Sequence, residues 1–456
     1  MPTTREALSS AFAERGHELW LVGGALRDRL LGGHQHDADY ATDALPDEVE
    51  AIARELGTGV VSVGKRFGTI GVLADGRWSE ITTFRGDSYT AGTRWPEVTF
   101  GTAIAEDLAR RDFTVNAMAE NAITGETLDL FGGREDLAAR TLRAVGEPAA
   151  RFREDPLRIL RGVRFVSQLG FDIEAATFAG MQETVALLAT LSQERITAEL
   201  DRLLLGEEPA RGLEALRETG ALPVILPELS DMVGCDQNHW HHLDVWGHTV
   251  ATVGAIATDG ADLRLRRWTA LLHDVGKPGV RHRKANGEWG FYRHETAGAI
   301  EAQALLQRLK LPRDLMLKVE LLVRRHMDRP DPADRRSVRR FMSKSGGLWR
   351  DLVALKRADN ASHTYDDTGY HDALHAACTR TEIEEAEALR AESPLSGDDL
   401  VALFDRAPGP WIRAVKNRLS AMVLDGDMAP GDRAHAELIA RQMISTTAVA
   451  SSGPPT

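Results

Sequence analysis

The sequence has little cysteine, no long apolar run and no excess of positive charge. Its 456 residues include only Cys235 and Cys378, which excludes a disulfide framework or a cysteine-rich zinc site and fits a reducing compartment. No apolar segment approaches the length of a membrane span, and the N-terminus lacks the apolar core of a signal peptide. These absences predict a cytoplasmic protein with no membrane partner.

The formal net charge is −13, which argues against a nucleic-acid partner because phosphate binding normally needs a basic surface. Although the net charge is negative, two segments of the chain are basic, residues 151–164 and 335–340. Local patches of this kind are enough to contact phosphates. The charge balance therefore weakens the hypothesis of an RNA partner without excluding it.

Secondary-structure patterns divide the chain into an N-terminal part rich in short strands and a longer helical part. Alternating apolar runs separated by glycine-rich turns predict an α/β domain with a small mixed sheet. Beyond it, apolar residues recur at helical spacing almost to the C-terminus. The sequence thus predicts the α+β class, with region boundaries at 1–145, 146–232, 233–365 and 366–446, and a disordered tail at 447–456.

The first candidate site begins where an apolar run meets two glycines. Residues 19–22 predict a buried strand, and Gly23 and Gly24 follow it directly. Glycines let a triphosphate approach the backbone closely, and the N–H groups at the start of the next helix favour anions. Arg27 and Asp28 fall on the first turns of that helix. The segment therefore predicts a phosphate-binding turn.

Paired carboxylates follow within a few residues. Residues 36–40 predict a second strand, on which Asp37 and Asp39 share one face. Two such carboxylates repel unless a cation joins them, and their hard oxygen atoms suit Mg²⁺. Glu80 interrupts another strand-like run and is either an exposed strand residue or a third carboxylate that completes the metal cage or helps to take a proton. Phosphates, Mg²⁺ and carboxylates together predict metal-dependent nucleotidyl transfer.

A second cluster of polar residues follows at 110–116. Arg110 and Arg111 offer a fork of donors suited to phosphate oxygens. Asp112 and Asn116 are four residues apart on an expected helix, so that they share a face and could hold a ribose and a base edge. The alternative is ordinary ion pairing on a helix surface.

Asp155 and Arg158 form a pair that could select a base. They are expected three residues apart on one helix, with Pro156 near its first turn. The carboxylate accepts from an amino group, and the guanidinium donates to a ring nitrogen or carbonyl. Cytosine and adenine match this pair, whereas uracil and guanine do not. A surface salt bridge is the alternative.

In this order and spacing, the motifs GGALRD, DAD, RRDFTVNAMA, DLFGGREDL and EDPLRILRGVRF resemble the class II CCA-adding tRNA nucleotidyltransferase and poly(A) polymerase family over about residues 19–205. The resemblance implies that Asp37 and Asp39 bind the catalytic metals and that Asp155 and Arg158 read the incoming base. It also implies that the glycine segment holds the triphosphate of CTP or ATP. Residues 1–145 would be the nucleotidyltransferase head, and the helical parts would hold the acceptor arm of tRNA.

The segment 86–101, which contains Arg94, corresponds to the family's flexible loop that affects addition of the terminal A. Its length fits an enzyme that adds the whole CCA end. Enzymes that add only CC, only A or a poly(A) tract remain open alternatives at this stage.

Histidines and aspartates spread over 248–359 predict a second site. In a helical bundle such residues can converge on one or two divalent ions, Mg²⁺ or a transition metal, that would activate a water to attack a phosphate ester. The spacing resembles the HD phosphohydrolase superfamily over about residues 243–365. The resemblance implies metal ligands at His248, His273, Asp274 and Asp359, with His294 and His326 supporting a second metal.

The leading hypothesis is a template-independent nucleotidyltransferase in which the 3′-hydroxyl of tRNA attacks the α-phosphate of CTP or ATP in a two-metal mechanism and releases pyrophosphate. The HD region would hydrolyse 2′,3′-cyclic phosphates or phosphate ends of damaged tRNA, or would be purely structural. Two other classes remain open: a phosphohydrolase with a silent RNA-binding first domain, and a non-enzymatic RNA chaperone.

Overall fold

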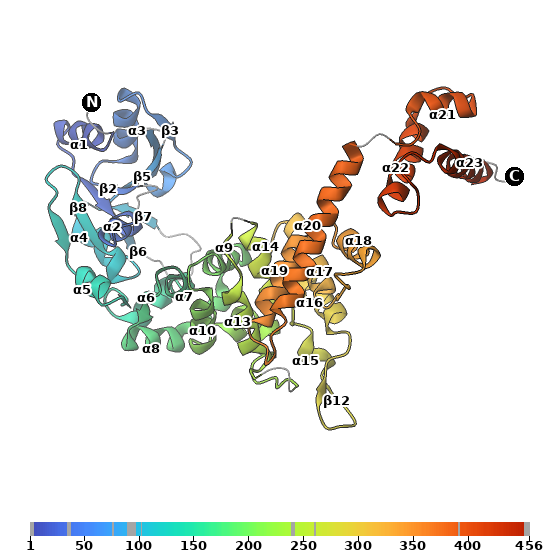
Figure 1. Cartoon of the computed structure of the whole chain (residues 1–456). Helices are drawn as coiled ribbons and strands as arrows, with labels where there is room; N and C mark the ends of the chain where they lie inside the picture. Colours follow the sequence, from blue (N-terminus) through green and yellow to red (C-terminus); the bar gives the residue numbers. More distant parts are fainter. Residues whose placement is uncertain are drawn as a thin grey trace, which may run out of the picture.

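The computed structural model describes residues 4–33, 38–74, 77–88, 97–101, 103–238, 242–259, 261–390 and 393–450. The chain forms a curved body with the sheet-containing head at one end and the last three helices at the other (Figure 1). The predicted α+β class is confirmed, since the strands of the large sheet all lie in the head and the rest is mainly helical. Within these residues no helix is long and apolar enough to cross a bilayer.

The head is built on a seven-stranded mixed sheet with the strand order β3-β4-β5-β2-β1-β8-β9. Only the β2–β5 pair is parallel, and the other neighbours are antiparallel. All four residues of β1 are buried, as expected for a central strand. The strands are β1 (Leu19–Val22), β2 (Ala38–Thr42), β3 (Gly59–Val61), β4 (Thr69–Ala74), β5 (Arg77–Thr83), β8 (Met118–Asn121) and β9 (Thr127–Asp129).

Short helices and three small strands complete the head. Helix α2 starts directly at the glycine pair, as the sequence predicts, and β2 extends two residues beyond its expected end at residue 40. These further elements are α1 (Thr4–Glu14), α2 (Gly23–Leu30), α3 (Pro46–Glu55), β6 (Arg85–Ser88), β7 (Glu97–Phe100), α4 (Ile104–Ala109), η2 (Thr114–Asn116), α5 (Gly133–Ala138) and β10 (Thr141–Leu142).

A group of helices follows the head and shares its hydrophobic core. Buried residues of α7 and α9 pack against each other, and the same core continues into the head through Phe113 and Phe152. The elements are α6 (Pro148–Glu154), α7 (Leu157–Leu169), β11 (Asp172–Ile173), α8 (Ala175–Thr184), η3 (Val185–Thr190), α9 (Gln193–Leu204), α10 (Pro209–Glu218), α11 (Leu222–Ile225) and α12 (Pro227–Ser230).

The histidine-rich region is a helical bundle from which one small hairpin, β12–β13, projects (Figure 1). Helices α13, α14 and α19 pack together, and α16 packs along α17. The elements are α13 (Val245–Ala255), α14 (Leu263–Leu272), α15 (Lys277–Val280), β12 (His282–Arg283), β13 (Trp289–Gly290), α16 (His294–Arg308), α17 (Arg313–Arg325), α18 (Arg335–Lys344) and α19 (Trp349–Asn360).

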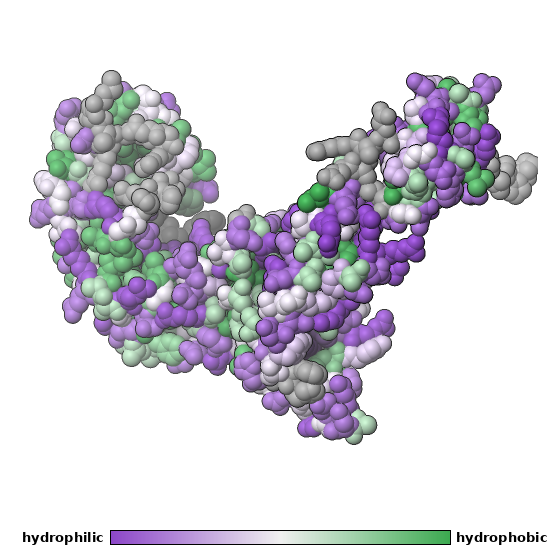
Figure 2. Space-filling model, in the orientation of Figure 1, coloured by the Kyte–Doolittle hydropathy of each residue, from purple (hydrophilic) through white to green (hydrophobic). Residues whose placement is uncertain are grey.

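The last part of the chain forms a separate hydrophobic core. The long helix α20 (Thr368–Arg390) lies beyond the expected boundary at 366, yet its residues Leu374 and Cys378 belong to the main core. By contrast, α21 (Gly397–Phe404), α22 (Pro410–Leu424) and α23 (Arg433–Ala450) pack around their own cluster, which includes Leu400 and Leu419. Figure 2 shows that hydrophilic residues gather around α18, where α20 leads towards this terminal unit.

Candidate functional site

The predicted nucleotide-site residues meet around one cavity of about 770 Å³ in the head. Its walls come from the β1–α2 junction, strands β2 and β5, the segment 107–116, and helices α7 and α9. Of the predicted residues, Asp37 lies outside the described residues, and Asp28 does not line the cavity. The others that line it are Gly23, Gly24, Arg27, Asp39, Glu80, Arg110, Arg111, Asp112, Asn116, Asp155 and Arg158.

Asp39 and Glu80 are direct register partners on the parallel strands β2 and β5. Residues paired in this way project side by side from the same face of a sheet. Both residues are exposed, so that two oxygen-bearing side chains stand together at the open edge of the cavity. This donor set fits a hard divalent cation such as Mg²⁺.

Gly23, the first glycine of the pair, is required because two side chains approach its backbone closely. Gly23 has φ of +67°, which L side chains rarely adopt, and an added Cβ would lie 3.0 Å from the Arg111 Nη1 and 3.8 Å from the Asp39 Oδ2. A side chain at this position would thus be strained and would stand between the arginine and the carboxylate. Because Gly23 has no side chain, the guanidinium group of Arg111 and the carboxylate of Asp39 can both lie beside the start of α2.

A chain of hydrogen bonds fixes the neighbouring polar residues. The Nη1 of Arg27 donates to the Oδ1 of Asn116 at 2.8 Å, and the Nδ2 of Asn116 donates to the Oδ1 of Asp112 at 3.1 Å. The Nε of Arg161 donates to the other oxygen of Asp112 at 2.7 Å. Asp28 contacts the Nε of Arg27 at 2.8 Å and so orients this arginine from outside the cavity.

The expectation that Asp112 and Asn116 share a helix is wrong, although their side chains do meet. Helix α4 ends at Ala109, Phe113 is extended with φ of −128° and ψ of 150°, and Asn116 lies on the short 3₁₀ helix η2. The pair is joined by a turn instead of helical spacing. Burial opposes ionisation of Asp112, but Arg161 and the bonds to Asn116 outweigh it and lower the pKa of the carboxyl.

Asp107 is a buried carboxylate that holds both arginines of the pair. Its Oδ1 accepts from the Nη2 of Arg110 at 2.6 Å, and its Oδ2 accepts from the Nη2 of Arg111 at 3.0 Å. Burial raises the pKa of Asp107, but the two guanidinium groups more than compensate and bring it below the ordinary value of 3.8. Asp107 is not among the site residues predicted from the sequence.

We expect Asp107→Asn to lower the free energy of unfolding by about 2 kcal/mol at neutral pH, because two arginines would lose their buried anion. Since the folded-state pKa is depressed, the ion pair's contribution is present above pH 3.8 and is lost as the pH falls through the lower folded-state pKa. Urea unfolding from pH 7 down to pH 2 should therefore show the two proteins converging at acid pH. A difference that stays constant over this range would contradict the ion-pair assignment.

Asp155 and Arg158 both line the cavity, but not from one helix. Asp155 is extended, with φ of −141° and ψ of 100°, at the end of α6, and α7 begins at Leu157. The cause is Pro156, which disfavours helical geometry in the residue before it. The Asp155 carboxylate contacts the Arg195 Nη2 at 3.0 Å, while the Arg158 Nη2 donates to the Arg110 carbonyl at 2.7 Å.

Most of the cavity's positive charge comes from helices α7 and α9. Eight arginines line it against five carboxylates, which locally reverses the negative balance of the whole chain. Sequence reasoning noted the basic character of residues 151–164 but gave none of the extra arginines a role. The arginines that it missed are Arg161, Arg164, Arg195 and Arg202.

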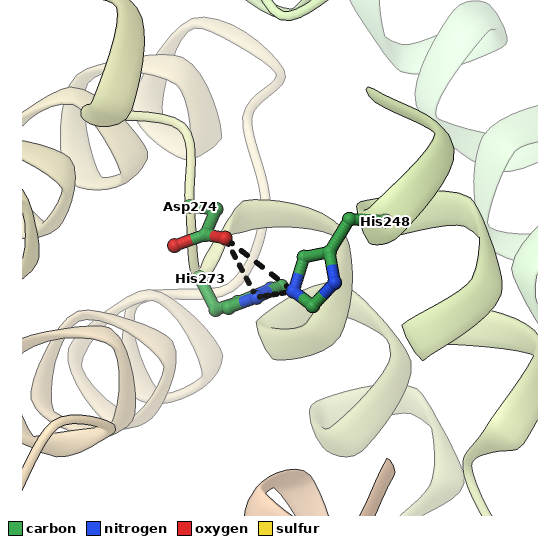
Figure 3. A group of neighbouring side chains, drawn as sticks. All are labelled: His248, His273 and Asp274. Carbon is green, nitrogen blue, oxygen red and sulfur yellow. Dashed lines mark hydrogen bonds and ion pairs between the residues drawn. The ribbon is translucent and has the colours of Figure 1, made fainter. Parts of the chain in front are cut away.

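The second site lies in the helical bundle, and Figure 3 shows the first part of it, with Asp274 facing both His273 and His248. The Asp274 Oδ2 lies 3.2 Å from the Nε2 of His273 and 3.5 Å from the Nε2 of His248. Asp359 approaches the Nε2 of His248 at 2.9 Å. The four residues predicted for the first metal therefore converge.

The other oxygen of Asp274 faces a second group. Its Oδ1 lies 3.3 Å from the Nε2 of His294 and 3.8 Å from that of His326, and these two nitrogen atoms are 3.1 Å apart. All three residues are buried. One carboxylate thus bridges two clusters, as expected of a site for two divalent ions.

The outer nitrogen atoms of the histidines are already occupied by backbone or hydroxyl partners. The Nδ1 atoms of His273, His294 and His326 lie 2.7–2.9 Å from the carbonyls of residues 270, 291 and 323, and the Nδ1 of His248 lies 2.6 Å from the Ser362 Oγ. A histidine that donates from Nδ1 presents the lone pair of Nε2. Four such lone pairs point into the same space, which fits metal coordination.

The electrostatics of the second site favour bound cations. Burial lowers the pKa of His326 to about 3, so that its imidazole is neutral at ordinary pH. Burial opposes ionisation of Asp274, yet His273 and Lys277 outweigh it and hold the carboxyl pKa well below its usual range. The pKa of His273 is raised because the neighbouring carboxylates outweigh its burial, and the same negative charge would attract a metal ion.

Two residues of this site were missed by the sequence analysis. His363 joins His248 and Asp359 in a possible ligand group, with its Nε2 3.4 Å from the Asp359 Oδ1. Lys277 places its ammonium group 2.6 Å from the Asp274 Oδ2. The sequence did contain a signal for both residues: His363 lies four residues after Asp359, and Lys277 lies three residues after Asp274.

Comparison with known proteins matches three parts of the chain to known domain families. Residues 19–143 match the poly A polymerase head domain, residues 170–232 match the probable RNA and SrmB-binding site of polymerase A, and residues 245–364 match the HD domain. A CCA-adding enzyme of Geobacillus thermodenitrificans is 34% identical over 91% of this chain and 90% of its own length. The chain belongs to the CCA-adding enzyme family of nucleotidyltransferases.

A solved structure supports the family assignment, and another relative shows that the family includes enzymes with a different product. A crystal structure of the Bacillus stearothermophilus CCA-adding enzyme in complex with CTP is 28% identical, covers 98% of this chain and 100% of that chain, and has a TM-score of 0.68. A CC-adding tRNA nucleotidyltransferase of Thermus thermophilus is also 34% identical, over 92% of each chain. Family membership alone therefore does not decide between the two products.

Proposed function

We propose that the head adds the CCA end to tRNA from CTP and ATP. The proposal rests on the arginine-rich cavity of the head, which Asp39, Glu80, Gly23 and Gly24 line together with the base-reading candidates Asp155 and Arg158. The match to CCA-adding enzymes over most of the chain supports the same activity.

In this reaction the 3′-hydroxyl oxygen of the tRNA attacks the α-phosphorus of the nucleotide. A new P–O bond forms, the bond between the α-phosphorus and the bridging oxygen breaks, pyrophosphate leaves, and the hydroxyl proton is released to solvent. Asp39, Glu80 and Asp37 would hold Mg²⁺, which supplies charge neutralisation and acidifies the attacking hydroxyl when bound. Arg27 and Arg111 are placed to bind the triphosphate.

Asp155→Asn should relax base selection. An amide presents a donor as well as an acceptor, so that uracil and guanine are no longer mismatched at this position. We expect the preference for CTP and ATP over UTP and GTP to fall by about 10- to 100-fold, measured as kcat/KM for single-nucleotide addition. Asp172→Asn, at an exposed carboxylate outside the cavity, is the control; unchanged selectivity in Asp155→Asn would remove this residue from base reading.

The product is determined by sequencing tRNA ends after incubation with all four nucleotides. Ends completed to CCA from tRNA that lacks all three nucleotides would support the proposal. Ends that stop at CC would favour the second candidate, for which the Thermus thermophilus relative is the specific argument. Residues 89–96 of the loop expected to affect this choice, including Arg94, lie outside the described residues. Repeated A would indicate a poly(A) polymerase, and no incorporation would overturn the assignment.

For the second site we propose hydrolysis of phosphate esters at RNA ends. A water oxygen attacks phosphorus, the P–O bond to the ribose breaks, and the ribose oxygen takes up a proton. Two divalent ions held by the histidines, Asp274 and Asp359 would supply an acidified water and charge neutralisation when bound. The converging Nε2 atoms and the bridging carboxylate support this proposal.

A further inference from the structure

A basic hairpin stands at the mouth of the second site. Residues 281–293 contain four arginine or lysine residues and one acidic residue, Glu288, in a chain with a net charge of −13. The hairpin projects from the bundle beside α15 in Figure 1, and its surface is largely hydrophilic in Figure 2. An exposed element of this charge attracts phosphates.

The hairpin also carries aromatic side chains. Trp289 lies between two guanidinium groups, with the Cζ of Arg281 3.7 Å and that of Arg283 4.0 Å from its ring centroid. Beside it, Tyr292 is 78% exposed. Cations interleaved with aromatic rings are the usual means of binding single-stranded nucleic acid, because rings stack on bases while cations contact the backbone.

The hairpin is continuous with the metal-ligand site. Lys284, Gly290 and Phe291 line the same cavity of about 630 Å³ as Asp274, His294 and His326. The carbonyl of Phe291 holds the Nδ1 of His294 at 2.9 Å. An RNA strand lying along the hairpin would therefore have its end directed into this cavity.

Arg293 marks the point where the hairpin joins α16. Its backbone lies in the left-handed region, with φ of +61° and ψ of 28°, which is unusual for a residue with a long side chain. This turn separates the exposed Tyr292 and Arg293 from the buried His294 that follows them. Within three residues the chain passes from an exposed aromatic and cationic surface to a metal-ligand candidate.

We propose that the hairpin 281–293 binds the single-stranded 3′ end of RNA and guides its terminal phosphate into the HD cavity. The inference rests on the phosphohydrolase function proposed above for that cavity and names its substrate class. The site would thus act on phosphate groups attached to RNA in preference to free nucleotides.

The first test compares two substrates of the full-length protein: a short RNA that ends in a 2′,3′-cyclic phosphate, which the head cannot extend, and free 2′,3′-cyclic CMP. We expect Arg283→Glu and Tyr292→Ala, at hairpin residues that do not line the cavity, each to raise KM for the RNA about tenfold and to leave kcat/KM for cyclic CMP within about twofold. The salt dependence of RNA binding should fall by about one cation in Arg283→Glu. Arg313→Glu, at an exposed cation of α17, is the matched control.

The second test does not depend on hydrolysis. An RNA of the same design with 4-thiouridine next to its end is crosslinked to the protein, and the linked peptide is identified by mass spectrometry. We expect crosslinks within residues 281–293. Crosslinks only in the head, or equal losses on both substrates in the hairpin variants, would overturn the inference. Crosslinks to the hairpin without hydrolysis of either substrate would retain it and reject the hydrolase proposal.

Discussion

Asp39→Asn should reduce nucleotide addition by about 10³-fold or more. Asp39 and Glu80 are register partners at the cavity edge, and loss of one charge removes an anionic ligand from the proposed Mg²⁺ site. The rate is measured in single turnover with labelled CTP and a tRNA that lacks its CCA end. The effect should appear in kcat and change tRNA affinity little, because the carboxylate acts on the reacting centre.

Asp47→Asn provides the comparison for this variant. Asp47 lies on α3, is 86% exposed at its side chain and pairs with Lys65 outside the cavity. Its substitution should leave the rate unchanged. If Asp39→Asn folds and keeps more than a tenth of the normal rate, the proposed metal site is misplaced.

Asp274→Asn should remove bound metal from the second site and abolish phosphate-ester hydrolysis, while nucleotide addition continues. An amide has only one oxygen and no charge, so that it cannot bridge the two clusters of histidines. Metal content is measured by mass spectrometry after dialysis, and both reactions are assayed on the same preparation. Loss of nucleotide addition together with hydrolysis would indicate a general folding defect.

His326→Ala refines this test, since it removes one ligand from a single cluster. His326 faces the Asp274 Oδ1, whereas His248 and His273 face the Oδ2. We expect the metal content to fall from two ions to one per chain. Asp372→Asn, at an exposed residue of α20, should retain both ions; a wild-type protein that binds no metal would reject the site.

Local sequence patterns predicted the elements that carry the head site. The apolar run before the glycine pair forms β1, the glycines open α2, and Glu80 lies on a strand as expected. These features depend on near neighbours in the chain, which periodicity can detect. The pairing of Asp39 with Glu80 depends on the order of strands in the sheet, which the sequence does not state.

The errors have identifiable causes. Pro156 disfavours helical geometry in Asp155, the residue before it, and this signal is present in the sequence. The prediction of one helix rested on the spacing of Asp155 and Arg158 and did not include this effect of proline. Asp107 and Arg195 act through partners on other elements, such as the ion pair between Arg195 and Asp155 across forty residues. Contacts of that range arise from tertiary packing, so that no window of sequence reveals them.

Ion pairs join helix α18 to the terminal unit formed by α21–α23, at the turn that follows α22. Arg336 of α18 pairs with Asp427, and Arg339 of the same helix contacts Asp425 as well as Glu385 of α20. The apolar cluster of the terminal unit is separate from the main core. Dissolved salt weakens ion pairs at a surface and leaves apolar packing nearly unaffected. The position of this terminal unit relative to the bundle should therefore depend on the surrounding electrolyte, whereas the architecture of the head should not.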